Sequence, residues 1–248
     1  MLIMSTNTPK PQSETYRPEL VFLPSLGWGR RLLRWVVKLF VYLIVRILTK
    51  SQVVGRENLP KKGPILLVSN HLGDADGVVG LAFARVPFDL LGKIELYDFP
   101  ILGVLMHTYG TIWVHRGHPD RRAIRAALNG LAEGRMVAIA PEGRESLSGA
   151  LEEGTSGAAY LALKADVPIQ PIVFTGTENN RIFGNLRKLR RTPVTVTIGK
   201  PFRLVHRGSF HQAIEDGTQT IMVSLAQMLP PEYQGIYQGI VEQEDGSE

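Results

Sequence analysis

His71 and Asp76 lie five positions apart in the segment SNHLGDADG, which spans residues 69–77. A histidine can take a proton from a hydroxyl group near neutral pH, provided that another group orients its ring and stabilises the imidazolium. A carboxylate five positions later can orient the ring and stabilise the imidazolium if a turn brings the two side chains together. The arrangement follows the logic of a serine–histidine–aspartate triad, with the substrate's own hydroxyl replacing the serine. The spacing alone also recurs by chance in solvated polar loops.

A second polar turn, PEGRES at residues 141–146, follows the apolar run MVAIA at residues 136–140. Gly143 lets a ligand approach the backbone closely, and Arg144 offers a fork of donors that matches phosphate. Taken alone, this segment is also typical of an ordinary surface turn.

Arg116 follows a third apolar run, TIWVH at residues 111–115, and a fourth run, VPIQPI, spans residues 167–172. In open α/β sheets, ligand chemistry collects at the carboxyl ends of the strands. The His71 segment likewise follows an apolar run, PILLVS at residues 64–69. We therefore expect the polar residues that follow the runs at residues 64–69, 111–115 and 136–140 to line one crevice. The fourth run carries no chemistry of its own.

Taken in the order in which they occur along the chain, the four segments resemble the sequence blocks of the glycerolipid acyltransferase family, which includes the lysophosphatidic acid acyltransferases. Those blocks read Asn-His-x-x-x-x-Asp, Gly-x-Ile-x-Val-x-Arg, Phe-Pro-Glu-Gly-Thr-Arg-Ser and Val-Pro-Ile-x-Pro-Val. The resemblance covers roughly residues 60–205, and four ordered blocks are far more specific than any one of them. The matching residues, block by block, are Asn70, His71 and Asp76; Gly110, Ile112, Val114 and Arg116; Pro141, Glu142, Gly143 and Ser146; and Val167, Pro168, Ile169 and Pro171.

The resemblance implies a transferase of phospholipid biosynthesis. It would move a fatty acyl group from an acyl thioester, acyl-CoA or acyl carrier protein, to the free hydroxyl of a lysophospholipid, with lysophosphatidic acid as the first candidate. His71 would be the general base and Asp76 its orienting partner. No metal and no bound organic cofactor are implied. The residues implied to bind the acceptor are Asn70, Arg116, Glu142, Gly143 and Arg144.

The third block departs from the family pattern. Arg144 stands at the threonine position and Glu145 at the arginine position, while Glu152 and Glu153 precede a glycine where a basic residue is usual. Carboxylates near a phosphate site are unfavourable for a dianionic headgroup. The departure therefore bears on the acceptor more than on the reaction, and a less charged or sugar-bearing headgroup is an alternative.

Two other site classes fit the sequence less well. Asp74 and Asp76 form an Asp-x-Asp pattern, which some glycosyltransferases use to bind a metal, but the His71–Asp76 reading accounts for the segment better. The basic cluster at residues 181–191 is compatible with nucleic-acid binding, yet it has no interleaved aromatic residue beyond Phe183. A loop that touches anionic lipid headgroups explains the cluster better, and we expect no nucleic-acid partner.

Apolar runs of strand length alternate with helical periodicity from residue 63 onward, which indicates an α/β fold with a mostly parallel sheet flanked by helices. Residues 51–240 are expected to form the acyltransferase domain. The predicted strands span residues 64–69, 88–92, 111–115, 136–140, 169–174 and 194–198. The predicted helices span residues 75–85, 99–109, 120–134, 157–165 and 211–228.

Two segments precede this domain: a proline-rich flexible arm at residues 1–25 and an amphipathic helix within residues 26–50. From Trp28 to Thr49, apolar residues recur at three- and four-residue steps. Another stripe is basic and consists of Arg30, Arg34, Lys38 and Arg46. The longest charge-free run, residues 39–45, is far short of the roughly 18 to 20 residues of a spanning helix. We expect this helix to lie in the interface of an anionic membrane, and a helix packed on the protein's own core is the alternative.

The composition of the 248-residue chain limits its partners and site classes. A formal net charge of +5 favours anionic partners such as a phospholipid surface. The absence of cysteine excludes disulfides, a thiol nucleophile and cysteine-based zinc sites. The first 20 residues show no secretory signal pattern, and residues 241–248 are expected to form a frayed acidic tail.

These features predict a membrane-associated protein, at the cytoplasmic face of the cell membrane. A non-catalytic peripheral membrane protein that binds lipid is the alternative to an enzyme. The presence of both His71 and Asp76 favours the enzyme.

Overall fold

The computed structural model describes residues 12–117, 120–206 and 208–245, and its centre is a seven-stranded sheet with the order β1-β7-β6-β2-β5-β3-β4. Neighbouring strands are parallel except β6 and β7, which are antiparallel. The predicted mostly parallel sheet is therefore confirmed. The strands are β1 (Thr49–Val54), β2 (Ile65–Ser69), β3 (Asp89–Lys93), β4 (Ile112–Val114), β5 (Met136–Ile139), β6 (Ile169–Thr175) and β7 (Thr192–Ile198).

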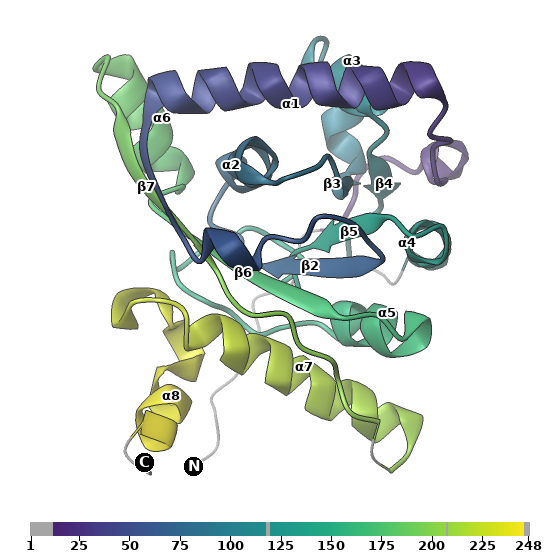
Figure 1. Cartoon of the computed structure of the whole chain (residues 1–248), viewed down its shortest axis with the longest axis vertical. Coiled ribbons are helices and arrows are strands. Elements are labelled where there is room, and N and C mark those ends of the chain that lie inside the picture. The colour runs from purple at the N-terminus through teal and green to yellow at the C-terminus, as the bar shows by residue number, and fades with distance from the viewer. Residues whose placement is uncertain (1–11, 118–119, 207, 246–248) are drawn as a thin grey trace.

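Helices flank the sheet on both faces, as predicted. Figure 1 shows α1 and α2 on one face and α5 and α7 on the other. The helices are α1 (Trp28–Leu48), α2 (Ala75–Phe83), α3 (Leu102–Tyr109), α4 (Arg121–Ala132), α5 (Gly157–Ala165), α6 (Asn179–Arg187), α7 (Phe210–Ala226) and α8 (Gln238–Asp245).

The position of β2 in the middle of the sheet explains why its sequence is apolar throughout. Leu66 and Val68 pack into the cluster that includes α4, α5 and α7. Ile65 and Leu67, which alternate with them, pack into the opposite cluster with residues of α1 and α2. A strand covered on both faces has no solvent side, so no polar alternation appears in its sequence.

Two elements differ from the sequence-based expectation. Residues 49–54 form β1, which pairs in parallel with β7 at the far end of the sheet. The basic stretch expected to be a loop contains a helix, α6, and its described basic side chains remain exposed. Both elements depend on partners distant in sequence, which local periodicity does not reveal.

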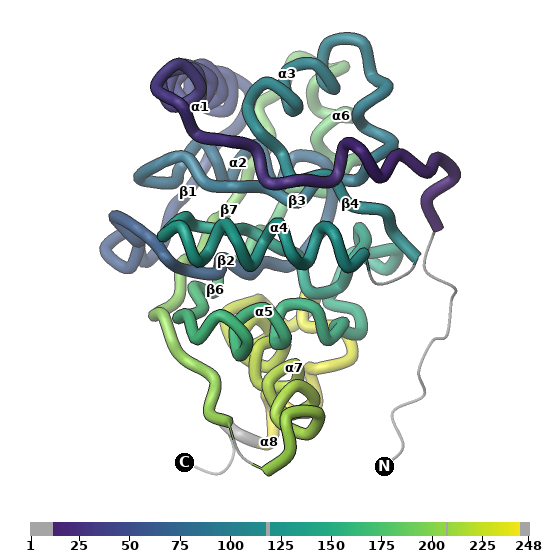
Figure 2. Tube along the Cα trace, turned by 90° about the vertical axis from the view of Figure 1, so that its right-hand side faces the viewer, coloured from purple at the N-terminus to yellow at the C-terminus, as the bar shows by residue number. Residues whose placement is uncertain are grey.

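Part of the predicted flexible arm packs on the domain. Figure 2 shows the segment before α1 crossing beside β3 and β4. The N–H of Ser13 donates to the carbonyl oxygen of Arg116 (3.0 Å), and the N–H of Arg116 donates to Ser13 Oγ (2.8 Å). The N–H of Arg17 donates to His115 Nε2 (2.9 Å), and Val21 is buried. These contacts hold the segment from residue 12 onward, whereas residues 1–11 of the predicted arm lie outside the described residues.

The predicted acidic tail also begins inside the fold. Val241 is buried in α8, against the core cluster that contains α7 residues. An apolar side chain among the acidic residues therefore holds the first part of this segment in place. Residues 246–248 lie outside the described part of the chain.

α1 has two apolar sides. Val37 and Val45 are buried in the clusters that include α2 residues. Nine large apolar side chains of α1 are exposed: Trp28, Leu32, Trp35, Val36, Leu39, Phe40, Leu43, Ile47 and Leu48. The single apolar stripe expected from the sequence thus divides between the core and the surface. Within the described residues, no helix is long and apolar enough to cross a bilayer, and the interfacial role of α1 stays a prediction.

Arg34 shows how firmly α1 is held. Its side chain, expected on the basic surface stripe, is buried, and its Nη2 donates to Asp89 Oδ1 (2.6 Å) and to the carbonyl oxygen of Phe88 (2.7 Å). The guanidinium carbon lies 4.5 Å from the centre of the Tyr109 ring. The second oxygen of Asp89 lies 3.6 Å from Arg135 Nη1. α1 is therefore joined to β3 by a buried ion pair.

Candidate active site

Five strands of the sheet run in the same direction and end at the same edge. They are β2, β3, β4, β5 and β6. His71 follows β2, Lys93 ends β3, Arg116 follows β4, Glu142 follows β5 and Asn179 follows β6. Polar residues that are far apart in the sequence therefore lie at one edge, as expected for a site in an α/β sheet.

The turn after β2 holds His71 against Asp76. His71 Nδ1 lies 2.9 Å from Asp76 Oδ2, and the same oxygen accepts the N–H groups of Leu72 (2.7 Å) and Gly73 (3.0 Å). A Cβ on Gly73 would lie 2.6 Å from Asn179 Oδ1, so this close turn requires glycine. The arrangement fixes the imidazole ring and leaves Nε2 as the ring nitrogen for proton transfer.

Opposing effects set the pKa of His71. Burial lowers this pKa, but the hydrogen bond to Asp76 and its charge, followed by the charges of Glu145 and Glu142, outweigh the burial. The pKa of His71 is therefore raised from its usual 6.5. The side chain is 30% exposed, so a solute can reach it. An oriented, accessible imidazole of this kind can serve as a general base.

Asn70 and Gly143 support the backbone of the site. Asn70 Nδ2 donates to the carbonyl oxygen of Phe174 (2.9 Å), and Asn70 Oδ1 accepts the N–H of Phe174 (2.8 Å). The buried amide of Asn70 thus joins β2 to β6, and the substrate-binding role expected for Asn70 stays a prediction. Gly143 has φ +72°, so it supplies the left-handed conformation of the turn after β5.

Glu142 was expected to bind the acceptor. In the structure its carboxylate accepts hydrogen bonds from two backbone N–H groups. Its Oε1 accepts the N–H of His71 (2.9 Å), and its Oε2 accepts the N–H of Glu152 (2.9 Å). Burial raises the pKa of Glu142 to about 7, although the hydrogen bonds from these two N–H groups lower it. The buried carboxyl group thus connects the turn after β5 to the backbone of the catalytic candidate.

The two arginines expected to bind phosphate are each paired with a carboxylate. Arg144 is buried, and its Nε and Nη2 donate to Glu152 Oε2 (2.9 and 2.6 Å). Arg116 Nη2 lies 3.9 Å from Glu95 Oε2. Two donors of the Arg144 guanidinium therefore face Glu152, and the acceptor-binding role expected for Arg144 stays a prediction.

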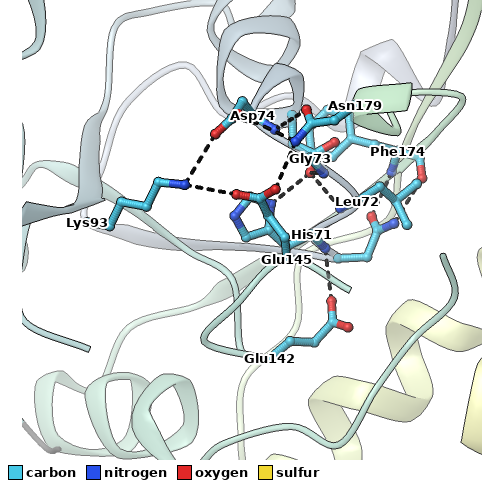
Figure 3. A network of polar contacts seen from close by, with 11 residues as sticks. His71, Leu72, Gly73, Asp74, Lys93, Glu142, Glu145, Phe174 and Asn179 are labelled. Carbon is cyan, nitrogen blue, oxygen red and sulfur yellow. Dashed lines mark hydrogen bonds and ion pairs between the residues drawn. The ribbon is translucent and has the colours of Figure 1, made fainter. Parts of the chain in front are cut away.

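A polar network that the sequence interpretation did not assemble lies beside His71 (Figure 3). Lys93 Nζ lies 3.1 Å from Glu145 Oε1 and 3.5 Å from Asp74 Oδ1. Asn179 Nδ2 donates to Glu145 Oε2 (2.9 Å). Lys93 and Asn179 could have been identified from the sequence by their position, because each lies at or just after the end of a strand.

An apolar cavity of ≈ 130 Å³ adjoins the catalytic candidates. Its walls come from α2 and from β2, β3, β5, β6 and β7, and they include His71 and Asp76. The lining residues of α2 extend from Asp76 to Phe83, so the cavity follows this helix for about 10 Å. Apolar lining residues include Leu67, Phe83, Ala138, Ile172, Phe174 and Val196.

Comparison with known proteins gives a consistent result. The sequence model of the family described as Acyltransferase matches residues 50–175. The chain is 31% identical over 191 residues to a 1-acyl-sn-glycerol-3-phosphate acyltransferase of Chlamydomonas reinhardtii, with 75% of this chain and 55% of that protein covered. It is 33% identical over 113 residues to a lyso-ornithine lipid O-acyltransferase of Pseudomonas aeruginosa, with 45% and 43% covered. The chain spans about half the length of the curated relatives it matches.

A solved structure shares the fold. The crystal structure of the 1-acyl-sn-glycerophosphate acyltransferase PlsC from Thermotoga maritima superposes with a TM-score of 0.62, over 88% of this chain and 81% of that one. The two sequences are 20% identical, so this likeness concerns the fold alone. It agrees with the sheet and flanking helices described above.

Proposed function

Because the chain belongs to the Acyltransferase family, we propose that it transfers a fatty acyl group from an acyl thioester to the free hydroxyl of a lysophospholipid. The observation that carries this proposal is the oriented His71–Asp76 pair on the wall of an apolar cavity. The pair supplies a base for a hydroxyl, and the cavity offers an apolar chain a place beside that base.

The geometry fits a direct transfer. The acceptor hydroxyl gives its proton to His71 Nε2 while its oxygen attacks the thioester carbonyl carbon. The new C–O bond forms, the C–S bond breaks, and the proton passes to the leaving thiolate. Asp76, held by its three hydrogen bonds, keeps the ring oriented and stabilises the imidazolium.

The cavity supports a fatty acyl substrate. Its lining is almost entirely aliphatic and aromatic side chains. Each methylene group removed from water contributes about 0.8 kcal/mol, so a chain in this cavity would bind without polar contacts. The polar reaction centre at His71 then lies next to an apolar binding surface.

The donor and acceptor follow from the same chemistry and from the names of the relatives. The donor is acyl-CoA or acyl carrier protein, since both present a thioester. Lysophosphatidic acid is the reference acceptor, because the C. reinhardtii relative is named for 1-acyl-sn-glycerol-3-phosphate. The P. aeruginosa relative, named for lyso-ornithine lipid, adds a second acceptor for testing.

A lipid acceptor also calls for a membrane location, and we propose the anionic, cytoplasmic face of the cell membrane. The exposed apolar side of α1 supports this, as do exposed apolar residues in and just before α3 and the net charge of +5. The residues in and just before α3 are Phe99, Ile101, Leu102 and Val104.

The test is a transfer assay with the full chain, a labelled long-chain acyl thioester on either carrier, and lysolipids in vesicles. Wild type should form the diacyl product, and His71→Ala should not. His115→Ala is the matched control, because His115 pairs with Asp120 (2.8 Å) at the same spacing but its Nε2 accepts the N–H of Arg17. Near-normal transfer by folded His71→Ala would sink the proposal, as would wild type that acylates no lysolipid.

A further inference from the structure

The cluster beside His71 is an ion-pair network with more negative than positive charge. Lys93 lies between the carboxylates of Glu145 and Asp74, at 3.1 and 3.5 Å. Asn179 fixes both carboxylates: its Nδ2 lies 2.9 Å from Glu145 Oε2 and 3.4 Å from Asp74 Oδ2, and its Oδ1 accepts the N–H of Asp74. Two carboxylates face one ammonium, so one negative charge is uncompensated.

The nearby arginines do not offset this charge. Arg144 is neutralised by Glu152, with two donors on one carboxylate oxygen. Arg116 lies against Glu95. A phosphate monoester would therefore find each of these cations already facing a carboxylate.

The network is within reach of an acceptor that reacts at His71. The side chain of Asp74 is 52% exposed, and those of Glu145 and Lys93 are each 26% exposed, so a solute can contact them. The charge of Glu145 acts on His71 directly, since it contributes to the raised pKa of that histidine. The ammonium of an ethanolamine headgroup lies beyond the phosphodiester, several bonds from the reacting hydroxyl, and this linker is long enough for the ammonium to reach the exposed carboxylates.

We propose that the acceptor is a zwitterionic lysolipid, whose headgroup ammonium binds Glu145 and Asp74, and not a lysolipid with a phosphate monoester. The inference rests on the proposed acyl transfer and specifies its acceptor. The ammonium pairs with the uncompensated carboxylate of the network, and the phosphodiester of the zwitterion carries only one negative charge. A phosphate monoester carries about −1.5 to −2 charges, and its approach would add like charge to the uncompensated carboxylate.

The test compares three acceptors that share one sn-1 acyl chain and a free sn-2 hydroxyl: lysophosphatidylethanolamine, lysophosphatidic acid and monoacylglycerol. Monoacylglycerol also has a free sn-3 hydroxyl, so only the sn-2 product is counted. Each is presented to the full chain in phosphatidylcholine vesicles, and kcat/KM is measured. The zwitterion should be preferred over each of the others by up to about fivefold, the upper end for a partly exposed charge pair. Preference for lysophosphatidic acid would overturn the inference.

Variants of Glu145 assign the preference to this residue. Glu145→Gln should reduce the ratio of zwitterion to monoacylglycerol, Glu145→Asp should keep part of it, and Glu145→Arg should favour lysophosphatidic acid. Glu153→Gln is the matched control, because Glu153 is an exposed carboxylate in the same connection, and it should leave the ratio unchanged. An unchanged ratio in Glu145→Gln would overturn the assignment.

A binding measurement separates this inference from the proposed reaction. Short-chain lysophosphatidylethanolamine and lysophosphatidic acid are titrated into the protein by calorimetry. Tighter binding of the zwitterion, lost in Glu145→Gln, supports the headgroup assignment even if no product forms. Absence of transfer to every acceptor would contradict the proposed reaction, whereas tighter binding of lysophosphatidic acid would contradict the acceptor class.

Discussion

At the scale of single residues, Asp76 is the group on which the geometry of the site depends. Its Oδ2 accepts the N–H groups of two residues besides its contact with the imidazole of His71. An asparagine keeps the shape but cannot stabilise an imidazolium. Asp76→Asn should therefore lower kcat, and by less than His71→Ala, for which the loss of a positioned base predicts roughly 10²- to 10⁴-fold.

The control for this comparison is Asp120→Asn, which changes the second His–Asp pair in the same way. It should retain the parent's kcat. Circular dichroism of each variant checks that the fold is intact. Equal kcat values for Asp76→Asn and wild type would show that Asp76 has no part in the reaction.

Glu142 gives a prediction for the pH dependence of stability. Its pKa in the folded chain, about 7, is above the usual 4.5, so the folded state binds this proton more tightly than the unfolded state. The contribution of Glu142 to the free energy of unfolding therefore increases as pH falls from about 7 toward 4.5. Between pH 8 and pH 5.5 it should add about 2 kcal/mol.

Urea unfolding of wild type and Glu142→Gln at both pH values measures this contribution. Glu142→Gln lacks the titrating group. Its stability relative to wild type should therefore be more favourable at pH 8 than at pH 5.5. If the free energies of unfolding of wild type and Glu142→Gln differ by the same amount at pH 8 and at pH 5.5, the raised pKa of Glu142 is refuted.

The contact between His71 and Asp76 could be predicted from the sequence because their spacing is local. His71 and Asp76 meet through one turn, and position at a strand end placed them at the sheet edge. The partners of Asn70 and Arg144 were not predictable in this way. Phe174 comes from another strand, and Glu152 reaches Arg144 only through the fold of the connection after β5.

At the scale of elements, α1 shows the limit of periodicity. A 3.6-residue repeat marks which residues share a side, but an apolar side has the same composition whether it meets protein or lipid. Here Val37 and Val45 meet the protein, while Leu39 and Leu43 are exposed. Arg34 was assigned to the surface for the same reason, since its partner Asp89 is 55 residues away.

The buried ion pair of α1 makes a stability prediction. Arg34→Met removes the partner that lies 2.6 Å from the fully buried Asp89 and leaves Arg135 at 3.6 Å. Breaking one side of a buried pair typically costs roughly 3 to 5 kcal/mol. The urea midpoint of Arg34→Met should fall accordingly, whereas the exposed control Arg31→Met should change it little.

A second variant tests the cause of that loss. Asp89→Asn together with Arg34→Met removes the unpaired charge and should recover part of the stability. A midpoint for Arg34→Met that equals that of Arg31→Met would show that the pair does not hold α1 in place.

At the scale of the whole molecule, the fold class followed from the alternation of strands and helices, but the order of the strands did not. An apolar run indicates that a strand exists and says nothing about its neighbours. β1 and β7 pair in parallel through residues 49–54 and 192–197, and both run opposite to β6. The common edge of β2 to β6 nevertheless brought the predicted site residues together, because parallel strands share their carboxyl ends.

The exposed apolar side of α1 also has a kinetic consequence. A chain seated on a bilayer meets its acceptor by lateral diffusion, so its velocity depends on the mole fraction of acceptor in the surface. Added inert phosphatidylcholine should lower the initial rate at constant bulk acceptor. Leu39→Gln with Leu43→Gln should weaken this surface dilution, whereas Val205→Gln, also exposed but outside α1, should not. A rate that follows only the bulk acceptor concentration would contradict this prediction. If the rate follows the surface mole fraction, the lipid composition of the membrane controls acyl transfer as directly as the supply of substrate does.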